Sequence, residues 1–264
     1  MIAAQGNGTI AFMKRHLYIL TGASRGMGLA MAEQLLQPQH YLLCLSRQRN
    51  ESLTLRAQQS GAVIAQWRQD LGETVASATR LASWLAQQQS ADWASASLIN
   101  NAGVIANPVP LSAAEASDVG TALRVGLEAP LLLTSAFLRC TETWPVPRRV
   151  LNISSGLGRR AMASQAPYCA AKAGMDHFTR CLALEEAAKP NGAKVCSIAP
   201  GVIDTDMQTQ LRSGDDATFP DRKGFVAMKV GGQLASPADA AARLLAYLAH
   251  PNFGALAVAD LREV

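Results

Sequence analysis

Leu17-Tyr18-Ile19-Leu20-Thr21-Gly22-Ala23-Ser24-Arg25-Gly26-Met27-Gly28 joins a short apolar run to a helical pattern through a glycine-rich turn. Residues 17–20 predict a buried strand, and residues 26–37 predict a helix that Pro38 ends. Glycines with the spacing G-x-x-x-G-x-G allow a tight turn, and a helix N-terminus offers free N–H groups to an anion. A loop of this kind, between the first strand and the first helix, favours a pyrophosphate site. A purely structural glycine turn is the alternative.

Apolar runs and helical patterns alternate along the rest of the chain. Further strands are predicted at residues 41–45, 62–67, 97–100, 149–154, 194–198 and 256–259. Further helices are predicted at residues 51–59, 73–89, 113–143, 165–188 and 237–249, with Gly120, Gly126 and Pro130 as candidate breaks in the long one. Continuous apolar strands that alternate with helices are typical of a parallel sheet covered on both faces. We predict an α/β fold, a single-domain Rossmann-type doubly wound parallel sheet of about seven strands with helices on both faces.

The chain shows no internal repeat and no linker-like change of composition. Residues 13–264 are therefore predicted to form one domain. Residues 1–12 are unpatterned and rich in Gly, Ala and Asn, which indicates a flexible N-terminal extension. Residues 204–235 are loop-rich, with room for short helical pieces and with apolar side chains among Gly, Ser and Asp. They are predicted to be a mobile lid over a substrate. The alternative, of equal weight, is that these apolar side chains only pack the segment onto the core.

The composition is that of a globular protein without a nucleic-acid or metal site. Hydrophobic residues make up 49% of the chain and charged residues 17%, and the formal net charge is +4 with scattered Lys and Arg. The five cysteines are far apart, which fits reduced thiols in the cytoplasm, and the four histidines are equally dispersed. The most apolar run, residues 129–138, is too short to span a membrane, and no signal peptide is visible.

The residues after the second strand indicate the type of dinucleotide. An NAD site usually carries Asp or Glu there for the ribose 2′-hydroxyl, whereas a 2′-phosphate is bound by Arg. This chain has Ser46-Arg47-Gln48-Arg49 and no carboxylate before Glu51, and Arg25 in the glycine loop adds a second cation. Because guanidinium groups suit phosphate, NADP(H) is predicted rather than NAD(H). The alternative is an ordinary exposed arginine, which applies more to Arg49 than to Arg47.

Tyr168 and Lys172 lie four residues apart in the helix predicted at 165–188, so they share one face of it. A lysine ammonium there favours the tyrosinate and is expected to lower the pKa of the phenol, which could then exchange a proton with a substrate oxygen. Ser155 follows the fifth predicted strand, at the strand end where open α/β sheets place their chemistry. By itself the pattern Y-x-x-x-K is common, and taken alone it favours a tyrosine packed beside a surface lysine.

The motifs together resemble the short-chain dehydrogenase/reductase family. From Met13 to the C-terminus they occur in family order: the glycine loop 21–28, Asp70-Leu71, Asn100-Asn101-Ala102-Gly103, Asn152-Ile153-Ser154-Ser155, Tyr168-x-x-x-Lys172 and Pro200-Gly201-x-x-x-Thr205. Asn152–Gly156 and Pro200–Gln208 resemble the sepiapterin reductase and benzil reductase branch in particular. The resemblance implies an NADPH-dependent carbonyl reductase that transfers a hydride to a ketone or diketone.

The resemblance also implies a role for each matched position. Tyr168 would be the general acid, Lys172 would lower its pKa and bind the nicotinamide ribose, and Ser155, rather than Ser154, would hold the substrate oxygen. The cofactor would be bound by Gly22, Ser24, Arg25, Gly26, Met27, Gly28, Arg47, Asp70, Leu71, Asn101, Ala102, Gly103, Tyr168, Lys172, Pro200, Gly201, Ile203 and Thr205. Three of these have structural alternatives: Asp70 as a turn residue, Asn101 as a strand-end amide, and Thr205 as a helix N-cap.

One position departs from the family. Val125-Gly126-Leu127-Glu128-Ala129-Pro130 places Gly126 where relatives carry an asparagine that helps to hold a proton-relaying water. A glycine keeps the backbone carbonyl but loses the side chain and loosens the helix. The protein is expected to have a working but slower relay. The alternative is a non-catalytic NADP(H)-binding sensor or scaffold on the same fold.

The remaining expectations concern the substrate and the assembly. The substrate pocket is predicted to include Leu157, Met162 and the 204–235 segment, which would suit an apolar or aromatic carbonyl compound. Asp260 is expected to be a solvated carboxylate, with contact to a polar substrate such as a pterin as the less favoured alternative. Relatives use the long helices at 113–143 and 165–188 for subunit contacts, so a homodimer or homotetramer is predicted.

Overall fold

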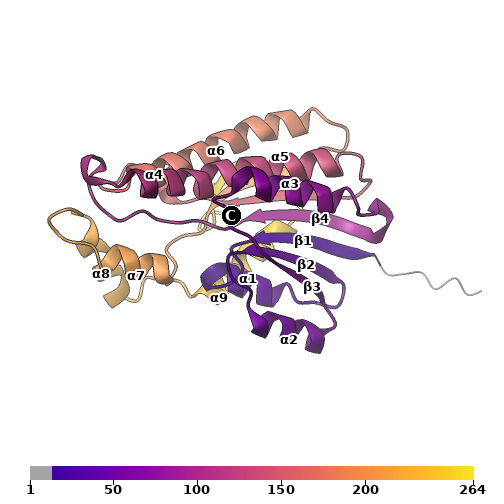
Figure 1. The fold of residues 1–264 in the computed structure, drawn as a ribbon, viewed down its shortest axis with the longest axis horizontal. Helices are drawn as coiled ribbons and strands as arrows, with labels where there is room; N and C mark the ends of the chain where they lie inside the picture. The colour runs from indigo at the N-terminus through magenta and orange to yellow at the C-terminus, as the bar shows by residue number, and fades with distance from the viewer. Residues whose placement is uncertain (1–13) are drawn as a thin grey trace, which may run out of the picture.

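The computed structural model describes residues 14–264, so the expectation for residues 1–12 lies outside the described residues. Seven parallel strands form one sheet in the order β3-β2-β1-β4-β5-β6-β7 (Figure 1). The strands are β1 (Arg15–Thr21), β2 (His40–Ser46), β3 (Val63–Arg68), β4 (Trp93–Asn100), β5 (Arg148–Ile153), β6 (Lys194–Ala199) and β7 (Val258–Asp260). The strand order reverses between β1 and β4, as in a doubly wound sheet. The predicted fold class is confirmed.

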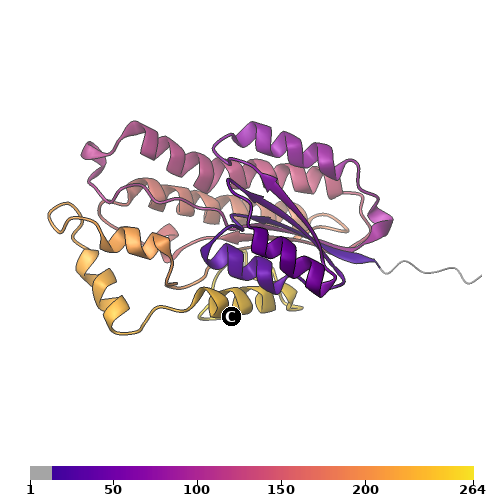
Figure 2. The same ribbon diagram turned by 60° about the horizontal axis from the view of Figure 1, so that its bottom comes forward.

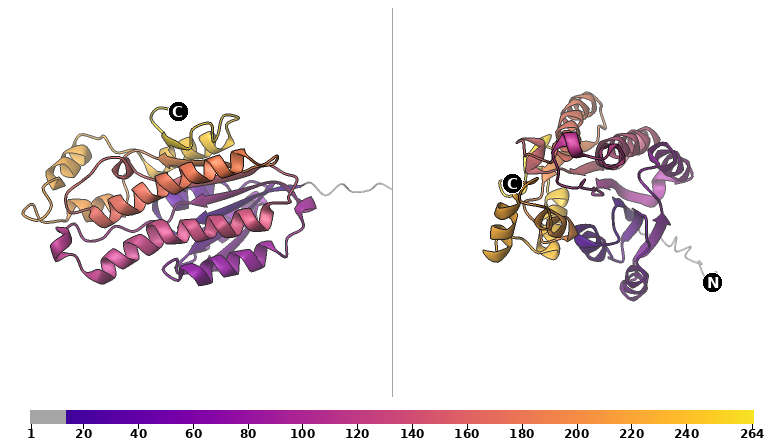
Figure 3. Two further views of the ribbon diagram at one scale, coloured as in Figure 1. Left: turned by 90° about the horizontal axis from the view of Figure 1, so that it is seen from above. Right: turned by 60° about the vertical axis from the view of Figure 1, so that its left-hand side comes forward.

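Helices cover both faces of the sheet. The nine α-helices among residues 14–264 are α1 (Gly26–Gln34), α2 (Glu51–Ser60), α3 (Thr74–Leu85), α4 (Ala116–Leu123), α5 (Ala129–Thr141), α6 (Ala166–Ala187), α7 (Asp206–Arg212), α8 (Arg222–Val230) and α9 (Pro237–Ala249). Helices α3, α5 and α6 lie side by side over one face (Figure 3), and α1, α2 and α9 lie on the other (Figure 2). Each layer encloses its own apolar core against the sheet.

The long helix does not break at the predicted positions. Helices α4 and α5 are joined by a π-helical turn, Arg124–Glu128, and together they form one helix, Ala116–Thr141. Gly126 lies in this turn and is buried. Pro130 has no N–H to donate to the carbonyl of Gly126, four residues earlier, so a local change to the wider turn replaces the expected break.

Among residues 14–264, one helix, Ala116–Thr141, is sufficiently long and apolar to cross a membrane, judged by its length and composition alone. It is longer than the apolar run considered in the sequence. Half of its most apolar 18-residue stretch is buried in the fold, where α5 packs on the sheet beside α3 and α6. A core helix of this kind meets the same criterion, so the span is weak evidence for a membrane.

The segment 204–235 lies beyond the carboxyl ends of the strands (Figure 1). It contains α7 and α8, and Leu211, Phe219 and Phe225 form a small apolar cluster there. Ile105 and Met162 from the body of the protein pack against this cluster. Short helices thus occupy about half of the segment, and its apolar residues pack together as the alternative to a lid describes.

Candidate active site

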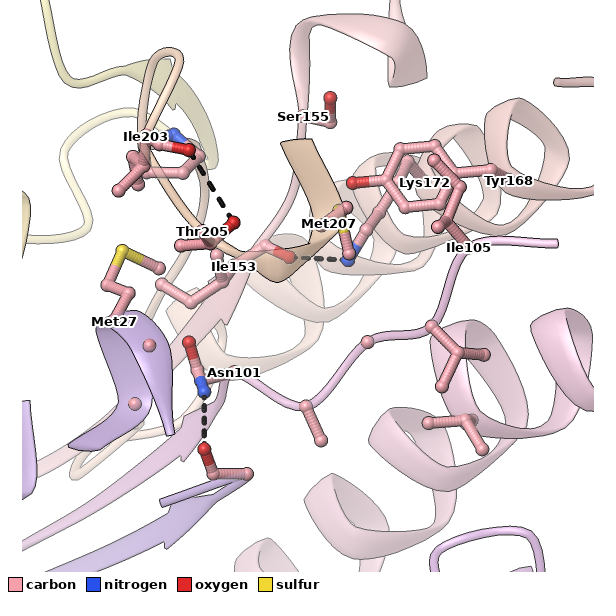
Figure 4. A pocket seen from close by; sticks show the side chains of 18 of the residues that line it. Met27, Asn101, Ile105, Ile153, Ser155, Tyr168, Lys172, Ile203, Thr205 and Met207 are labelled. Carbon is pink, nitrogen blue, oxygen red and sulfur yellow. Dashed lines mark hydrogen bonds between the residues drawn. The ribbon is translucent and has the colours of Figure 1, made fainter. Parts of the chain in front are cut away.

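All nineteen residues predicted for the site line one cavity at the carboxyl ends of the strands, with a volume of about 900 Å³. Figure 4 labels several of them, among them Ser155, Tyr168 and Lys172. They are Gly22, Ser24, Arg25, Gly26, Met27, Gly28, Arg47, Asp70, Leu71, Asn101, Ala102, Gly103, Ser155, Tyr168, Lys172, Pro200, Gly201, Ile203 and Thr205. Parallel strands end at the same edge of a sheet, so segments far apart in the sequence meet there.

The glycine loop leaves room for an anion at the start of α1. A Cβ on Gly28 would lie 2.0 Å from the carbonyl oxygen of Gly22, and Gly22 itself has a φ of +72°. No side chain caps the N-terminus of α1, and its first turn carries no acidic residue. Its free N–H groups and the positive end of its dipole therefore fit the pyrophosphate of a dinucleotide.

Asn101 holds the glycine loop in place from the neighbouring strand. Its Nδ2 donates to the carbonyl of Thr21 at 3.0 Å, and the Thr21 hydroxyl accepts from the N–H groups of Asn101 and Ala102. The side chain also lines the cavity. The strand-end amide expected as the alternative is therefore observed, and the same contacts set the shape of the loop.

Positive side chains lie beside the part of the cavity that Ser24, Arg25 and Arg47 line. A second hollow of about 370 Å³ is lined by Ser24, Arg25, Arg47, Gln48 and Arg68. Arg68 ends β3 directly beside Ser46 of β2, a juxtaposition that the sequence pattern did not reveal. Arg25 forms an exposed ion pair with Asp206 at 3.2 Å, which leaves it less available than predicted. Arg49 lines neither hollow, in agreement with its interpretation as an ordinary exposed arginine.

Two of the predicted residues also have local structural contacts. Asp70 Oδ1 accepts from the N–H of Gly72 at 2.8 Å, so Asp70 is a turn residue as well as a cavity residue. Thr205 occupies the N-cap position of α7, but its side chain makes no capping hydrogen bond. Asp70 therefore has the role of a turn residue that was its alternative. Thr205 does not cap α7 with its side chain, and it lines the cavity.

Ser155, Tyr168 and Lys172 meet between β5 and α6. Tyr168 and Lys172 lie one turn apart on α6 and are both buried, and Ser155 follows β5. The Lys172 ammonium donates to the carbonyl of Ile153 at 2.7 Å and lies 5.7 Å from the centre of the Tyr168 ring (Figure 4). The hydroxyls of Ser155 and Tyr168 thus border the same part of the cavity.

The protonation of this group differs from the expectation. Burial raises the pKa of Tyr168 to about 12. A hydrogen bond with the side chain of Ser155 lowers the pKa, but by less than burial raises it. Burial lowers the pKa of Lys172 to about 8, against the opposing charge of Asp176. The net shift is opposite to the lowered pKa that the sequence predicted for the phenol, because loss of solvent outweighs the hydrogen bond with Ser155. The phenol is a protonated donor at neutral pH.

The other end of the cavity is mostly apolar. Its walls include the predicted Leu157 and Met162 and the apolar residues Ile105, Met207, Leu211, Phe225 and Met228. Ile105, which follows β4, had no periodic pattern that could have identified it. Polar residues that line the cavity and lay outside the prediction are Arg124, Arg160, Gln208 and Arg262.

Asp260 is not the solvated carboxylate that the sequence suggested. It is the last residue of β7, it is buried, and it lines the cavity. Arg262 folds back and donates to both carboxylate oxygens, at 2.8 and 2.6 Å. These bonds hold the pKa of Asp260 down to about 2, so the carboxylate is ionised and paired.

Comparisons with known proteins agree with this geometry. Residues 16–216 match the short chain dehydrogenase family. The chain is 37% identical to a benzil reductase ((S)-benzoin forming) of Bacillus cereus, covering 83% of this chain and 88% of that one. It is 30% identical to the sepiapterin reductase of Bos taurus, covering 93% and 94% of the two chains. A solved short-chain dehydrogenase/reductase from Burkholderia vietnamiensis is 32% identical with a TM-score of 0.61, covering 96% and 99%. The chain belongs to the short-chain dehydrogenase/reductase family and is an oxidoreductase that acts on CH–OH or C=O groups.

Proposed function

We propose that this protein is an NADPH-dependent carbonyl reductase that converts a ketone or diketone to an alcohol, with Tyr168 as the general acid. The observation that carries the proposal is the buried, protonated Tyr168 hydroxyl beside Ser155 at the cavity wall. The similarity to a benzil reductase favours an aromatic diketone, and the apolar wall around Phe225 and Met228 has matching chemistry.

The chain would use its own groups to orient the carbonyl and to move one proton. The Ser155 hydroxyl donates to the carbonyl oxygen and the Tyr168 hydroxyl protonates that oxygen as negative charge develops on it. The Lys172 ammonium stabilises the tyrosinate that remains. When bound, reduced nicotinamide supplies the hydride. The glycine loop would hold its pyrophosphate, and Arg47 with Arg68 would hold the 2′-phosphate.

The test is NADPH oxidation followed at 340 nm with benzil and with sepiapterin as separate substrates. The proposal expects turnover of benzil with NADPH, and slower turnover with NADH. Gly126 favours the second candidate, a non-catalytic sensor or scaffold. That candidate expects tight NADPH binding and no turnover on any carbonyl compound, which would contradict the reductase.

Replacement of Gly126 by asparagine is expected to raise kcat. In the structure a Cβ at this position would lie 3.1 Å from the Cβ of Ala171 on α6, which is tight but leaves room for a small shift. The added amide would place a side-chain hydrogen-bonding group beside the π turn, where a relay water would bind. The measurement is the pH profile of kcat for wild type, Gly126→Asn and Gly126→Ala. An equal gain in Gly126→Ala would assign the effect to helix stiffening of about 1 kcal/mol instead.

We also propose a cytoplasmic homodimer or homotetramer that contacts itself through α5 and α6. Leu131 on α5 and Leu184 on α6 are exposed large apolar side chains on the two helices. Light scattering is expected to give a mass of two or four times the 27.9 kDa chain. Leu184→Glu should lower that mass, and Leu55→Glu, at another exposed leucine, on α2, should leave it unchanged. A wild-type monomer would contradict the proposal.

A further inference from the structure

The two hydroxyls that would touch the substrate come from separate elements. Ser155 lies in the turn that follows β5, and Tyr168 lies in the first turn of α6. Their separation depends on how residues 154–160, called here the Ser155 segment, pack against that helix. Positioned groups lose much of their effect when displaced by about 1 Å, so the contact between the two elements matters for chemistry.

Asp176 joins these elements from within the protein. It lies one turn beyond Lys172 on α6 and is only 1% exposed. Its Oδ2 accepts from the Arg159 Nε at 3.1 Å, and its Oδ1 accepts from the Ser197 hydroxyl of β6 at 2.6 Å. Arg159 also donates to the carbonyl of Ala259 in β7, at 2.7 Å. One buried carboxylate therefore connects α6, β6 and the Ser155 segment, and through Arg159 it reaches β7.

Gly158 shows how closely the Ser155 segment approaches the helix. A Cβ on Gly158 would lie 2.9 Å from the carbonyl oxygen of Lys172 and 3.1 Å from Asp176 Oδ2. The segment thus contacts α6 between the lysine and the aspartate. This close approach is independent of the ion pair, and both place the same residues together.

We propose that Asp176 is a positioning residue for the reductase, which holds the Ser155 segment on α6 through Arg159 and stabilises the charged form of Lys172. This inference rests on the proposed function and deepens it. A buried carboxylate is costly unless it is paired. Here the carboxylate of Asp176 forms an ion pair with Arg159, and its negative charge also acts on the ammonium of Lys172. The aspartate therefore has two effects, one on geometry and one on charge.

The electrostatics of Lys172 agree with this role. Burial lowers the pKa of Lys172 to about 8, and the charge of Asp176 is the influence that raises it. Other titratable or charged groups on Lys172's helix and on the elements packed against it include Tyr168 and Cys169 on α6, Arg159 on the Ser155 segment, Arg124 on the π turn and Asp118 on α4. Asp176 is the acidic side chain that lies one turn from Lys172 on the same helix.

Opposite changes on the two partners of the ion pair provide the test. In Asp176→Asn the anion is lost and the shape is kept, so the pKa of Lys172 should fall by about one unit. In Arg159→Met the compensating cation is lost, so the pKa of Lys172 should rise. The measurement is a ¹³Cε-lysine NMR titration of the purified protein, with the Lys172 signal assigned by Lys172→Arg. A purely structural role would not give shifts of opposite sign.

A matched variant separates charge from hydrogen bonding. Ser197→Ala removes the 2.6 Å hydrogen bond and keeps the carboxylate, so the Lys172 titration should stay close to wild type. The proposal is overturned if Asp176→Asn and Arg159→Met shift Lys172 in the same direction, or if neither shifts it. If Asp176→Asn does not fold, an unshifted titration in Arg159→Met overturns it alone.

The kinetic profile distinguishes this inference from the proposed function. The alkaline limb of kcat for reduction should move with the Lys172 titration in each variant, because loss of the ammonium removes the stabilised tyrosinate. Opposite NMR shifts without carbonyl turnover in any protein would contradict the reductase and would still show that Asp176 and Arg159 act on the charge of Lys172. Turnover without those shifts would support the reductase and overturn the role of Asp176.

Discussion

Tyr168→Phe is expected to lower kcat for NADPH-dependent ketone reduction by about 10²- to 10⁴-fold, the range found for loss of a positioned general acid. The substitution removes one oxygen from a buried ring and keeps the packing. The phenol has a pKa of about 12, so it is protonated at neutral pH and ready to donate. Steady-state kinetics with benzil gives kcat, and fluorescence titration gives the Kd for NADPH, which should change little.

The control is Tyr18→Phe, at a partly buried tyrosine of β1 that lies outside the cavity. It removes the same oxygen and should leave kcat and the Kd for NADPH at wild-type values. Retained turnover in Tyr168→Phe would show that another group donates the proton. An equal loss of NADPH binding and turnover would instead assign Tyr168 to cofactor binding.

The topology explains why so much of the site could be predicted from the sequence. Each predicted motif follows a strand or begins the next helix, and seven parallel strands bring those positions to one edge of the sheet. The motif at 21–28 and the pair Tyr168 and Lys172 needed only strand order and helix spacing to meet. Local pattern and global fold agree at these positions.

The features that could not be predicted depend on three-dimensional burial. The pKa of Tyr168 rises because surrounding residues exclude water from its hydroxyl, and no spacing in the sequence measures that exclusion. Arg262 pairs with Asp260 because the chain turns back after β7. Arg68 reaches the second hollow through the register of β2 with β3, which an apolar run does not determine.

Arg47→Asp is expected to reverse the preference for NADP(H) over NAD(H). Arg47 and Arg68 line the second hollow, and neither side chain has an ion-pair or hydrogen-bond partner among residues 14–264, so both are available to a phosphate. A hydrogen bond to a charged group contributes about 1.5–3 kcal/mol, which corresponds to a loss of about 10- to 150-fold in NADPH affinity. The new carboxylate would also repel the phosphate and could accept from a ribose 2′-hydroxyl, so NADH should bind more tightly.

The measurement is the Kd for NADPH and for NADH by fluorescence titration, together with kcat/KM for benzil with each cofactor. Arg49→Asp is the matched control, because it makes the same charge change two residues away at an exposed side chain outside both hollows. A general electrostatic effect would weaken NADPH binding equally in both variants and contradict a direct phosphate contact. Arg25 and Arg68 remain in Arg47→Asp, so NADPH binding should weaken without being lost. An unchanged ratio of the two Kd values would contradict the assignment of this hollow to the 2′-phosphate.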